Sequence, residues 1–158
     1  MKLHLGCGDM IIPGFINCDL YNDKAEVKCD VKKLPYEDNS IDEIYNAHII
    51  EHFDYFEALD VLKEWKRVLK PDGKLSIETP DFFAICDALV KAPEGERFML
   101  YDQFFGKPWL PGQTHKFLYT ENQLGNTLNN LGFRNIIKVP ALRYIGMENI
   151  CLRMNCIK

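Results

Sequence analysis

The sequence predicts an α/β fold: a single doubly wound, mostly parallel seven-stranded sheet with an antiparallel strand near the C-terminus. Three observations lead to this prediction. Short apolar or alternating segments recur along the chain, several of them end at a glycine or an aspartate, and helical patterns or long crossovers separate most of the first five. Parallel strands need such crossovers, whereas antiparallel strands can be joined by tight turns.

The individual elements follow from local patterns. Seven segments have the length and period of strands, namely 2–5, 15–18, 25–29, 41–47, 74–79, 134–140 and 149–157. Apolar residues recur every three or four positions over residues 55–69, which predicts an amphipathic helix. Asp81 is typical of a helix N-cap, and Thr120 and Gln123 have the spacing of a capping box, so two more helices are expected behind these residues. Residues 92–118 are predicted to be irregular, and 141–148 to form a loop.

Length and composition limit the class of protein. A chain of 158 residues suits one domain, so we expect residues 1–158 to form a single domain. The content of 47% hydrophobic and 27% charged residues argues against disorder, and no apolar run approaches the ~20 residues of a membrane helix. The N-terminus does not resemble a signal peptide, and the six cysteines form no C-x-x-C pair, so we expect a reduced, cytoplasmic protein. The net charge of −4 argues against a nucleic-acid partner.

Polar and glycine residues follow the first three predicted strands. Gly6 and Gly8 follow the first strand, Asp19 ends the second, and Asp30-Val31 ends the third. Glycines allow a backbone to approach a ligand closely. A carboxylate at Asp19 suits two ribose hydroxyls, and the carboxylate and next backbone N–H of Asp30-Val31 suit the edge of an adenine. In doubly wound sheets such ligands bind at the carboxyl ends of the strands.

This order of motifs resembles the class I S-adenosylmethionine-dependent methyltransferases, in a minimal, methyltransferase-11-like small-molecule form. The similar segments are 3–8, Asp19, 29–31, the lead-in to the fourth strand at 34–42, 67–75, and residues between 115 and 133. The resemblance implies a Rossmann-like sheet, S-adenosyl-L-methionine as cofactor, and methyl transfer to a small-molecule or glycan-type acceptor. It also implies that the cofactor contacts Leu5, Gly6, Cys7, Gly8, Asp19, Leu20, Asp30, Val31, Asn46, Ala47 and His48.

The sequence also departs from that family. His4 stands where the family usually has an acidic residue, and only 11 positions separate Gly8 from Asp19, so the helix between the first two strands must be absent or reduced to a turn. We therefore expect a sheet open on one side, which a homodimer could cover. A non-catalytic module or subunit that binds S-adenosylmethionine or a nucleoside is the alternative function.

The segment His48-Ile49-Ile50-Glu51-His52 has a second interpretation, because H-x-x-E-H marks a class of zinc hydrolases. Two histidines four apart on a helix can share a zinc ion, and Glu121 would supply the third ligand. The flanking strand and the upstream glycine loop favour the methyltransferase interpretation, so no metal is expected. In that interpretation Glu51 and His52 face the acceptor, and His52 or His115 takes a proton from a hydroxyl acceptor.

Residues 92–119 form the remaining candidate feature. The segment is long, contains seven aromatic residues, and is tethered between the fifth strand and the helix that begins after Thr120. Aromatic walls suit a small ligand and exclude water. We therefore expect an acceptor lid in which His115 points into the pocket; the alternative is a purely structural cover.

Overall fold

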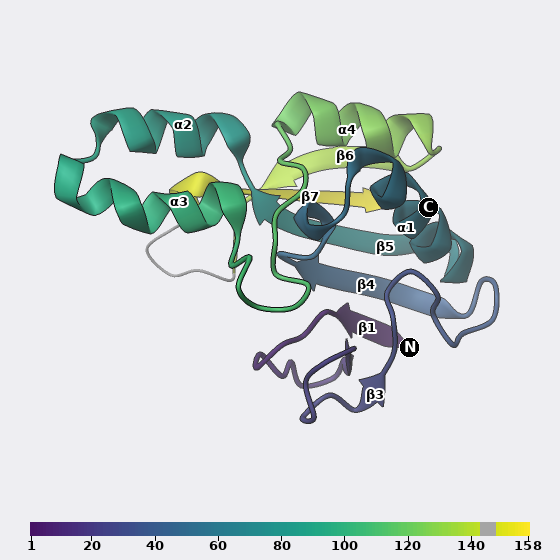
Figure 1. Cartoon of the computed structure of the whole chain (residues 1–158). Helices are drawn as coiled ribbons and strands as arrows, with labels where there is room; N and C mark the ends of the chain where they lie inside the picture. Colours follow the sequence, from purple (N-terminus) through teal and green to yellow (C-terminus); the bar gives the residue numbers. More distant parts are fainter. Residues whose placement is uncertain (143–147) are drawn as a thin grey trace.

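The computed structural model describes residues 1–142 and 148–158, so the predicted loop at 141–148 lies largely outside the described residues (Figure 1). The strands are β1 (Lys2–Leu5), β2 (Ile16–Asp19), β3 (Val27–Lys28), β4 (Ile41–Ala47), β5 (Leu69–Pro80), β6 (Arg134–Val139) and β7 (Cys151–Ile157). They form one seven-stranded sheet in the order β3-β2-β1-β4-β5-β7-β6. β1 to β5 pair in parallel, whereas β7 is antiparallel to both β5 and β6. This arrangement confirms the predicted Rossmann-like fold class.

The helices are α1 (Tyr55–Val68), α2 (Phe82–Lys91), α3 (Arg97–Phe105) and α4 (Glu121–Asn130), with 3-10 turns η1 (Ile50–His52), η2 (Glu94–Glu96) and η3 (Glu148–Ile150). The predicted caps are present. Asp81 accepts hydrogen bonds from the first turn of α2, and Thr120 and Gln123 form the capping box of α4. None of the helices in the described ranges has both the length and the apolar character that a membrane crossing requires.

The prediction that residues 92–118 are irregular is wrong for α3. No side chain caps the N-terminus of this helix, because Glu96 makes no capping hydrogen bond. Its aromatic residues also do not gather on one side, since Phe98 and Phe105 are exposed while other residues of α3 lie against α2. Both usual signals of a helix, the cap and the apolar stripe, are therefore missing from the sequence of α3.

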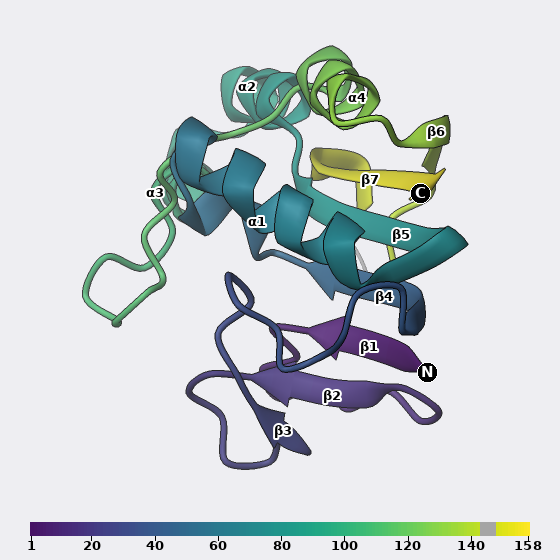
Figure 2. The ribbon, with the colours of Figure 1, turned by 90° about the vertical axis from the view of Figure 1, so that its right-hand side faces the viewer.

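The connection between β1 and β2 contains no helix. Residues 6–15, all of which the structure describes, form turns, as the short spacing between Gly8 and Asp19 predicts. Residues 20–26 likewise join β2 to β3 without a helix. The edge of the sheet formed by β1, β2 and β3 is therefore built almost entirely from strands and turns, as Figure 2 shows.

The hydrophobic core lies on one face of the sheet. Alternate strand residues pack there against α1 and α4, among them Leu3, Ile44 and Leu75. The register places these three side by side on neighbouring strands, so the same face of the sheet runs from β1 to β5. The large side chain of Trp65 on α1 is fully buried in this core.

The opposite face of the sheet is polar. Lys2 and Glu43 form an ion pair at 2.8 Å, and the guanidinium of Arg153 lies 5.6 Å from the ring of Tyr45 and donates to Ser76. Such pairs satisfy polar groups on neighbouring strands without a covering helix. Side-chain contacts between neighbouring strands therefore help to hold this face of the sheet together.

Trp65 connects the core to the carboxyl end of β3. Its Nε1 donates a 3.0 Å hydrogen bond to the carbonyl of Val31. We expect Trp65→Phe to lower the free energy of unfolding by about 1–3 kcal/mol, because a buried carbonyl loses its donor. Urea denaturation measures this change. The matched control is Trp109→Phe at the exposed second tryptophan, which should change stability by less than about 0.5 kcal/mol. Equal effects of the two variants would contradict the assigned role.

Candidate active site

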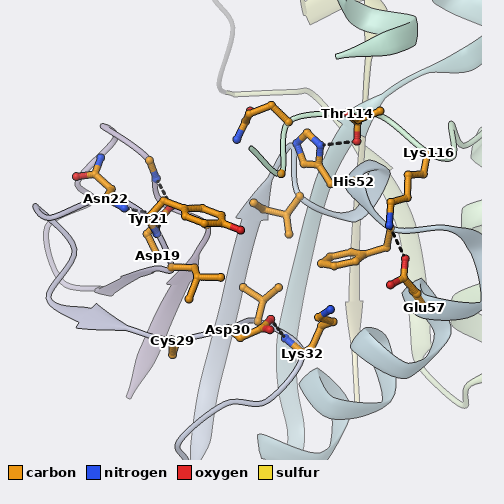
Figure 3. Close-up of a pocket in the computed structure, with 18 residues that line it drawn as sticks. Asp19, Tyr21, Asn22, Cys29, Asp30, Lys32, His52, Glu57, Thr114 and Lys116 are labelled. Atoms are coloured by element: carbon orange, nitrogen blue, oxygen red, sulfur yellow. Dashed lines mark hydrogen bonds and ion pairs between the residues drawn. The ribbon is translucent and has the colours of Figure 1, made fainter. Parts of the chain in front are cut away.

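A cavity of about 600 Å³ lies at the carboxyl ends of β1, β2 and β3. Its volume falls within the range of small-molecule sites. Figure 3 shows Asp19, Tyr21 and Asn22 on one wall, with His52 and Thr114 across from them. The cavity therefore joins the ends of β1, β2 and β3 to the segment after β4 and to part of the 92–119 segment.

The glycine loop after β1 forms part of the cavity lining. Gly6 and Gly8 both have positive φ angles, of 63° and 50°. A Cβ atom on Gly6 would lie 1.9 Å from Cδ1 of Ile49, a residue that also lines the cavity. Glycine is therefore required at position 6 both for the backbone conformation and for the space that Ile49 occupies.

Asp19 organises the wall around it. One carboxylate oxygen accepts a 2.9 Å hydrogen bond from the N–H of Gly8, and the other accepts from the N–H groups of Tyr21 and Asn22 at 2.8 and 2.9 Å. An ionised carboxylate offers about four acceptor positions. Three are used within the chain, which holds the glycine loop and the turn after β2 together and leaves one for a ligand.

Six of the predicted cofactor residues line the cavity, namely Gly6, Gly8, Asp19, Leu20, Asp30 and Val31. Five do not: Leu5, Cys7, Asn46 and Ala47 are buried beside it, and His48 is mostly buried. Sequence reasoning missed further lining residues, including Tyr21, Asn22 and Lys32. All three follow the predicted acidic residues closely, so proximity in the chain could have identified them.

Glu51 lies in the 3-10 turn η1, which follows β4, and its side chain is fully buried. Its Oε2 accepts a 3.1 Å hydrogen bond from Oγ1 of Thr79, and its Oε1 lies 3.1 Å from Nδ1 of His48. Burial pushes the pKa of Glu51 upward, but the hydrogen bond from His48 and the nearby imidazoles outweigh it, so the net pKa is lowered. Glu51 is thus an ionised carboxylate that does not reach the cavity surface.

His52 and His115 lie next to Glu51. Their ring centroids are 4.9 Å apart, and one ligand atom from each histidine and from Glu51 lies within 4.8 Å of the others. Nδ1 of His52 faces the carbonyl of Thr114 at 3.1 Å, and Nδ1 of His115 faces that of Gln103 at 2.9 Å. Burial lowers the pKa of His115, which favours its neutral form. His52 lines the cavity, whereas His115, which the sequence placed in the pocket, is not among its lining residues.

The 92–119 segment closes one side of the cavity. Gly112, Thr114 and Lys116 line it, and the N–H groups of Lys116 and Phe117 donate to the main-chain carbonyl of Glu51. Trp109 is 68% exposed and is not among the lining residues. The part of the segment next to the cavity is therefore residues 112–116, tied to the sheet through Glu51.

The zinc-hydrolase interpretation requires His48 and His52 on one face of a helix. Residues 50–52 form only a 3-10 turn, and His48 has a positive φ angle of 56°. The expected third ligand, Glu121, forms an ion pair with Lys138 at 3.0 Å. The H-x-x-E-H segment therefore lacks the helical geometry on which that interpretation depends.

The contact between Gly6 and Ile49 gives a direct test of the glycine loop. We expect Gly6→Ala to lower the free energy of unfolding by roughly 2–4 kcal/mol, from backbone strain and overpacking. Chemical denaturation measures it, and adding Ile49→Ala should recover part of the loss. Gly14→Ala is the control: it has a positive φ of 83° and no atom within 4 Å of the added Cβ, so about 1–2 kcal/mol is expected. A cost for Gly6→Ala no larger than the control would show that Ile49 does not restrict this position.

Known proteins share the sequence pattern and the strand arrangement of this chain. Residues 11–77 match the Methyltransferase domain family. Three solved S-adenosylmethionine-dependent methyltransferases are similar over 99% of this chain. They come from Methanosarcina mazei (18% identity, 91% of that chain, TM-score 0.67), Archaeoglobus fulgidus (17%, 85%, 0.65) and Aquifex aeolicus (19%, 80%, 0.57). No curated protein matches the chain. Residues 11–77 are therefore similar to a methyltransferase domain, and the chain has the fold of the class I S-adenosylmethionine-dependent methyltransferases; this similarity implies S-adenosyl-L-methionine as the cofactor.

Proposed function

We propose that this domain transfers a methyl group from S-adenosylmethionine to a small-molecule or glycan-type acceptor. The observation that supports this most directly is the cavity, in which a wall of glycines and carboxylates lies across from an imidazole. When bound, S-adenosylmethionine supplies a methyl group on a positively charged sulfur. The class of acceptor remains a prediction. The homodimer that would cover the open side of the sheet remains a prediction as well.

The residues of the first wall fit the cofactor chemically. Asp19 retains an acceptor position for a ribose hydroxyl, and Asp30 and Val31 offer a carboxylate and a backbone N–H at the adjacent edge. Gly6 and Gly8 allow close backbone approach beside them. These residues would hold the nucleoside, with Leu5, Cys7, Leu20, Asn46, Ala47 and His48 supporting the rest of the site.

The opposite wall would hold the acceptor. His52 lines the cavity, and the hydrogen bond of its Nδ1 to a carbonyl leaves Nε2 as the atom that can take a proton from a hydroxyl. Residues 112–116 close this side and restrict water, which favours alignment of two reactants. Glu51 has no exposed surface, so its proposed role is to position the two histidines rather than to touch the acceptor.

A non-catalytic binding module is the second candidate. One observation favours it: three of the acceptor positions of Asp19 are occupied within the chain, which leaves the ribose a single contact there. A methyl-labelled cofactor incubated with pools of metabolites, nucleosides, sugars and proteins separates the two functions. Labelled product supports methyl transfer, whereas cofactor binding without product in any pool supports the module.

Asp19 provides the first test of the cofactor site. We expect Asp19→Ala to weaken binding of S-adenosylhomocysteine by about 1.5–3 kcal/mol, as expected for a lost charge-assisted hydrogen bond and a loosened glycine loop. Titration calorimetry measures the affinity. Asp23→Ala, an exposed aspartate paired with Lys28, is the control and should bind like the wild type. Equal affinity of Asp19→Ala and wild type would remove Asp19 from the site.

His115 tests the acceptor side. We expect His115→Ala to lower turnover by about 10²–10⁴ if the histidine pair assists proton removal, while cofactor affinity stays within about twofold. Steady-state kinetics together with calorimetry separate the two quantities. The turnover and cofactor affinity of His115→Ala are compared with those of Trp109→Ala, which changes an exposed residue outside the cavity lining. Wild-type turnover and acceptor affinity in both His115→Ala and Trp109→Ala would reduce the 92–119 segment to structural cover.

A further inference from the structure

We propose that Glu51, His52 and His115 form a binding site for one divalent transition-metal ion, with zinc as the reference ion. One potential ligand atom from each of these three side chains lies within 4.8 Å of the other two. Two imidazoles and one carboxylate form a donor set that binds zinc and other first-row divalent ions. The proposal concerns ion binding and rests on these residues, not on the proposed methyl transfer.

The two histidines are in the tautomer that a metal site needs. A carbonyl oxygen can only accept, so Nδ1 of His52 must donate to Thr114 and Nδ1 of His115 must donate to Gln103. With Nδ1 as the donor, Nε2 of each ring is the nitrogen that can bind a metal ion. Metal-binding histidines are held in this manner, with the second ring nitrogen donating to a backbone carbonyl or a carboxylate.

The carboxylate of Glu51 is also oriented by neighbouring protein groups. Oε2 of Glu51 accepts from Thr79 on β5, and Oε1 contacts His48 at the end of β4. Glu51 has no exposed surface, and a buried carboxylate is costly unless positive charge or hydrogen bonds compensate. A divalent ion between Glu51 and the two histidines would supply that positive charge. All three ligands thus have a second protein group that orients them.

The geometry favours a metal site with one coordination position free for a ligand, rather than a structural site in which protein side chains fill every position. Among the residues that the structure describes, three protein ligands converge, and His52 lines the cavity, so a further coordination position would face the acceptor side. Ligand atoms around zinc lie about 2.0–2.2 Å from the ion and therefore roughly 3.5 Å from each other. The separations between the ligand atoms need to shorten by about 1.3 Å at most, from 4.8 Å, which side-chain rotations allow.

A second group of potential ligands, His48, Glu78 and Cys151, lies nearby. It is less suited to an exchangeable ion, because none of these three residues lines the cavity. Cys151 belongs to this group alone. It therefore provides a variant that distinguishes the two groups.

Ion binding would also change the acceptor chemistry. With Nε2 of both histidines bound to the ion, a hydroxyl at the open position would have a lowered pKa. Its O–H bond would break with the electron pair kept by oxygen, and the proton would pass to water. This step uses the same three residues as direct proton removal by a histidine, so activity alone cannot separate the two.

The test measures ion binding directly. Chelator-treated full-length protein is titrated with Zn²⁺ by calorimetry and with Co²⁺ by visible absorption, and we expect one ion per chain. His52→Ala and His115→Ala should each weaken Zn²⁺ binding by more than about 100-fold, and Thr79→Val by about 10–100-fold. Cys151→Ser should bind like the wild type, as should Thr127→Val, which changes a buried threonine of α4.

Three results would overturn the proposal: no ion bound by the wild type, unchanged binding in His115→Ala, or loss of binding in Cys151→Ser. Circular dichroism and S-adenosylhomocysteine binding verify that each variant is folded. If His115→Ala does not fold, Thr79→Val decides together with the Co²⁺ spectrum. Cofactor binding without ion binding sinks only this inference, whereas ion binding without cofactor binding sinks only the proposed function.

Discussion

The structure around the cavity depends on one buried carboxylate, that of Glu51. Its side chain contacts Thr79 on β5 and His48 after β4, and its main-chain carbonyl accepts the N–H groups of Lys116 and Phe117. One residue thus joins two central strands to the segment that closes the cavity. Because Glu51 is fully buried, removing its side chain would take one partner from the Thr79 hydroxyl and one from the His48 imidazole, whereas its main-chain carbonyl would still accept from Lys116 and Phe117. The placement of His52 and Thr114 follows from this arrangement.

The sequence predicted the sheet well because its signals are local. Glycines, acidic strand ends and side-chain caps act over a few residues, so Asp81 and Thr120 identified two helices and the short spacing from Gly8 to Asp19 excluded one. Helix α3 escaped prediction because it has neither a side-chain cap nor an apolar stripe. Its position is determined by packing against α2, which the sequence of the segment alone does not indicate.

The candidate site was predictable in its residue types but not in its contacts. The sequence identified Asp19 as a strand-end carboxylate, yet its hydrogen bonds to three backbone N–H groups depend on how the glycine loop and the turn after β2 meet. It likewise identified Glu51, His52 and His115 without showing that they converge. Residues 52 and 115 are far apart in the chain, and only the folded arrangement of the 92–119 segment brings them together.

The absence of helices between β1, β2 and β3 affects which part of the sheet unfolds locally first. β3 contributes two residues and pairs with β2 through only two positions, and neither connection at this edge packs a helix on the core. By contrast, β4, β5 and β7 are long and lie under α1 and α4. Cooperative units with few buried contacts have the lowest free energy of local unfolding. Amide hydrogens of β2 and β3 should therefore exchange with solvent well before those of β5, and any ligand held by Asp19 and Asp30 would slow that exchange by tying the edge to the rest of the domain.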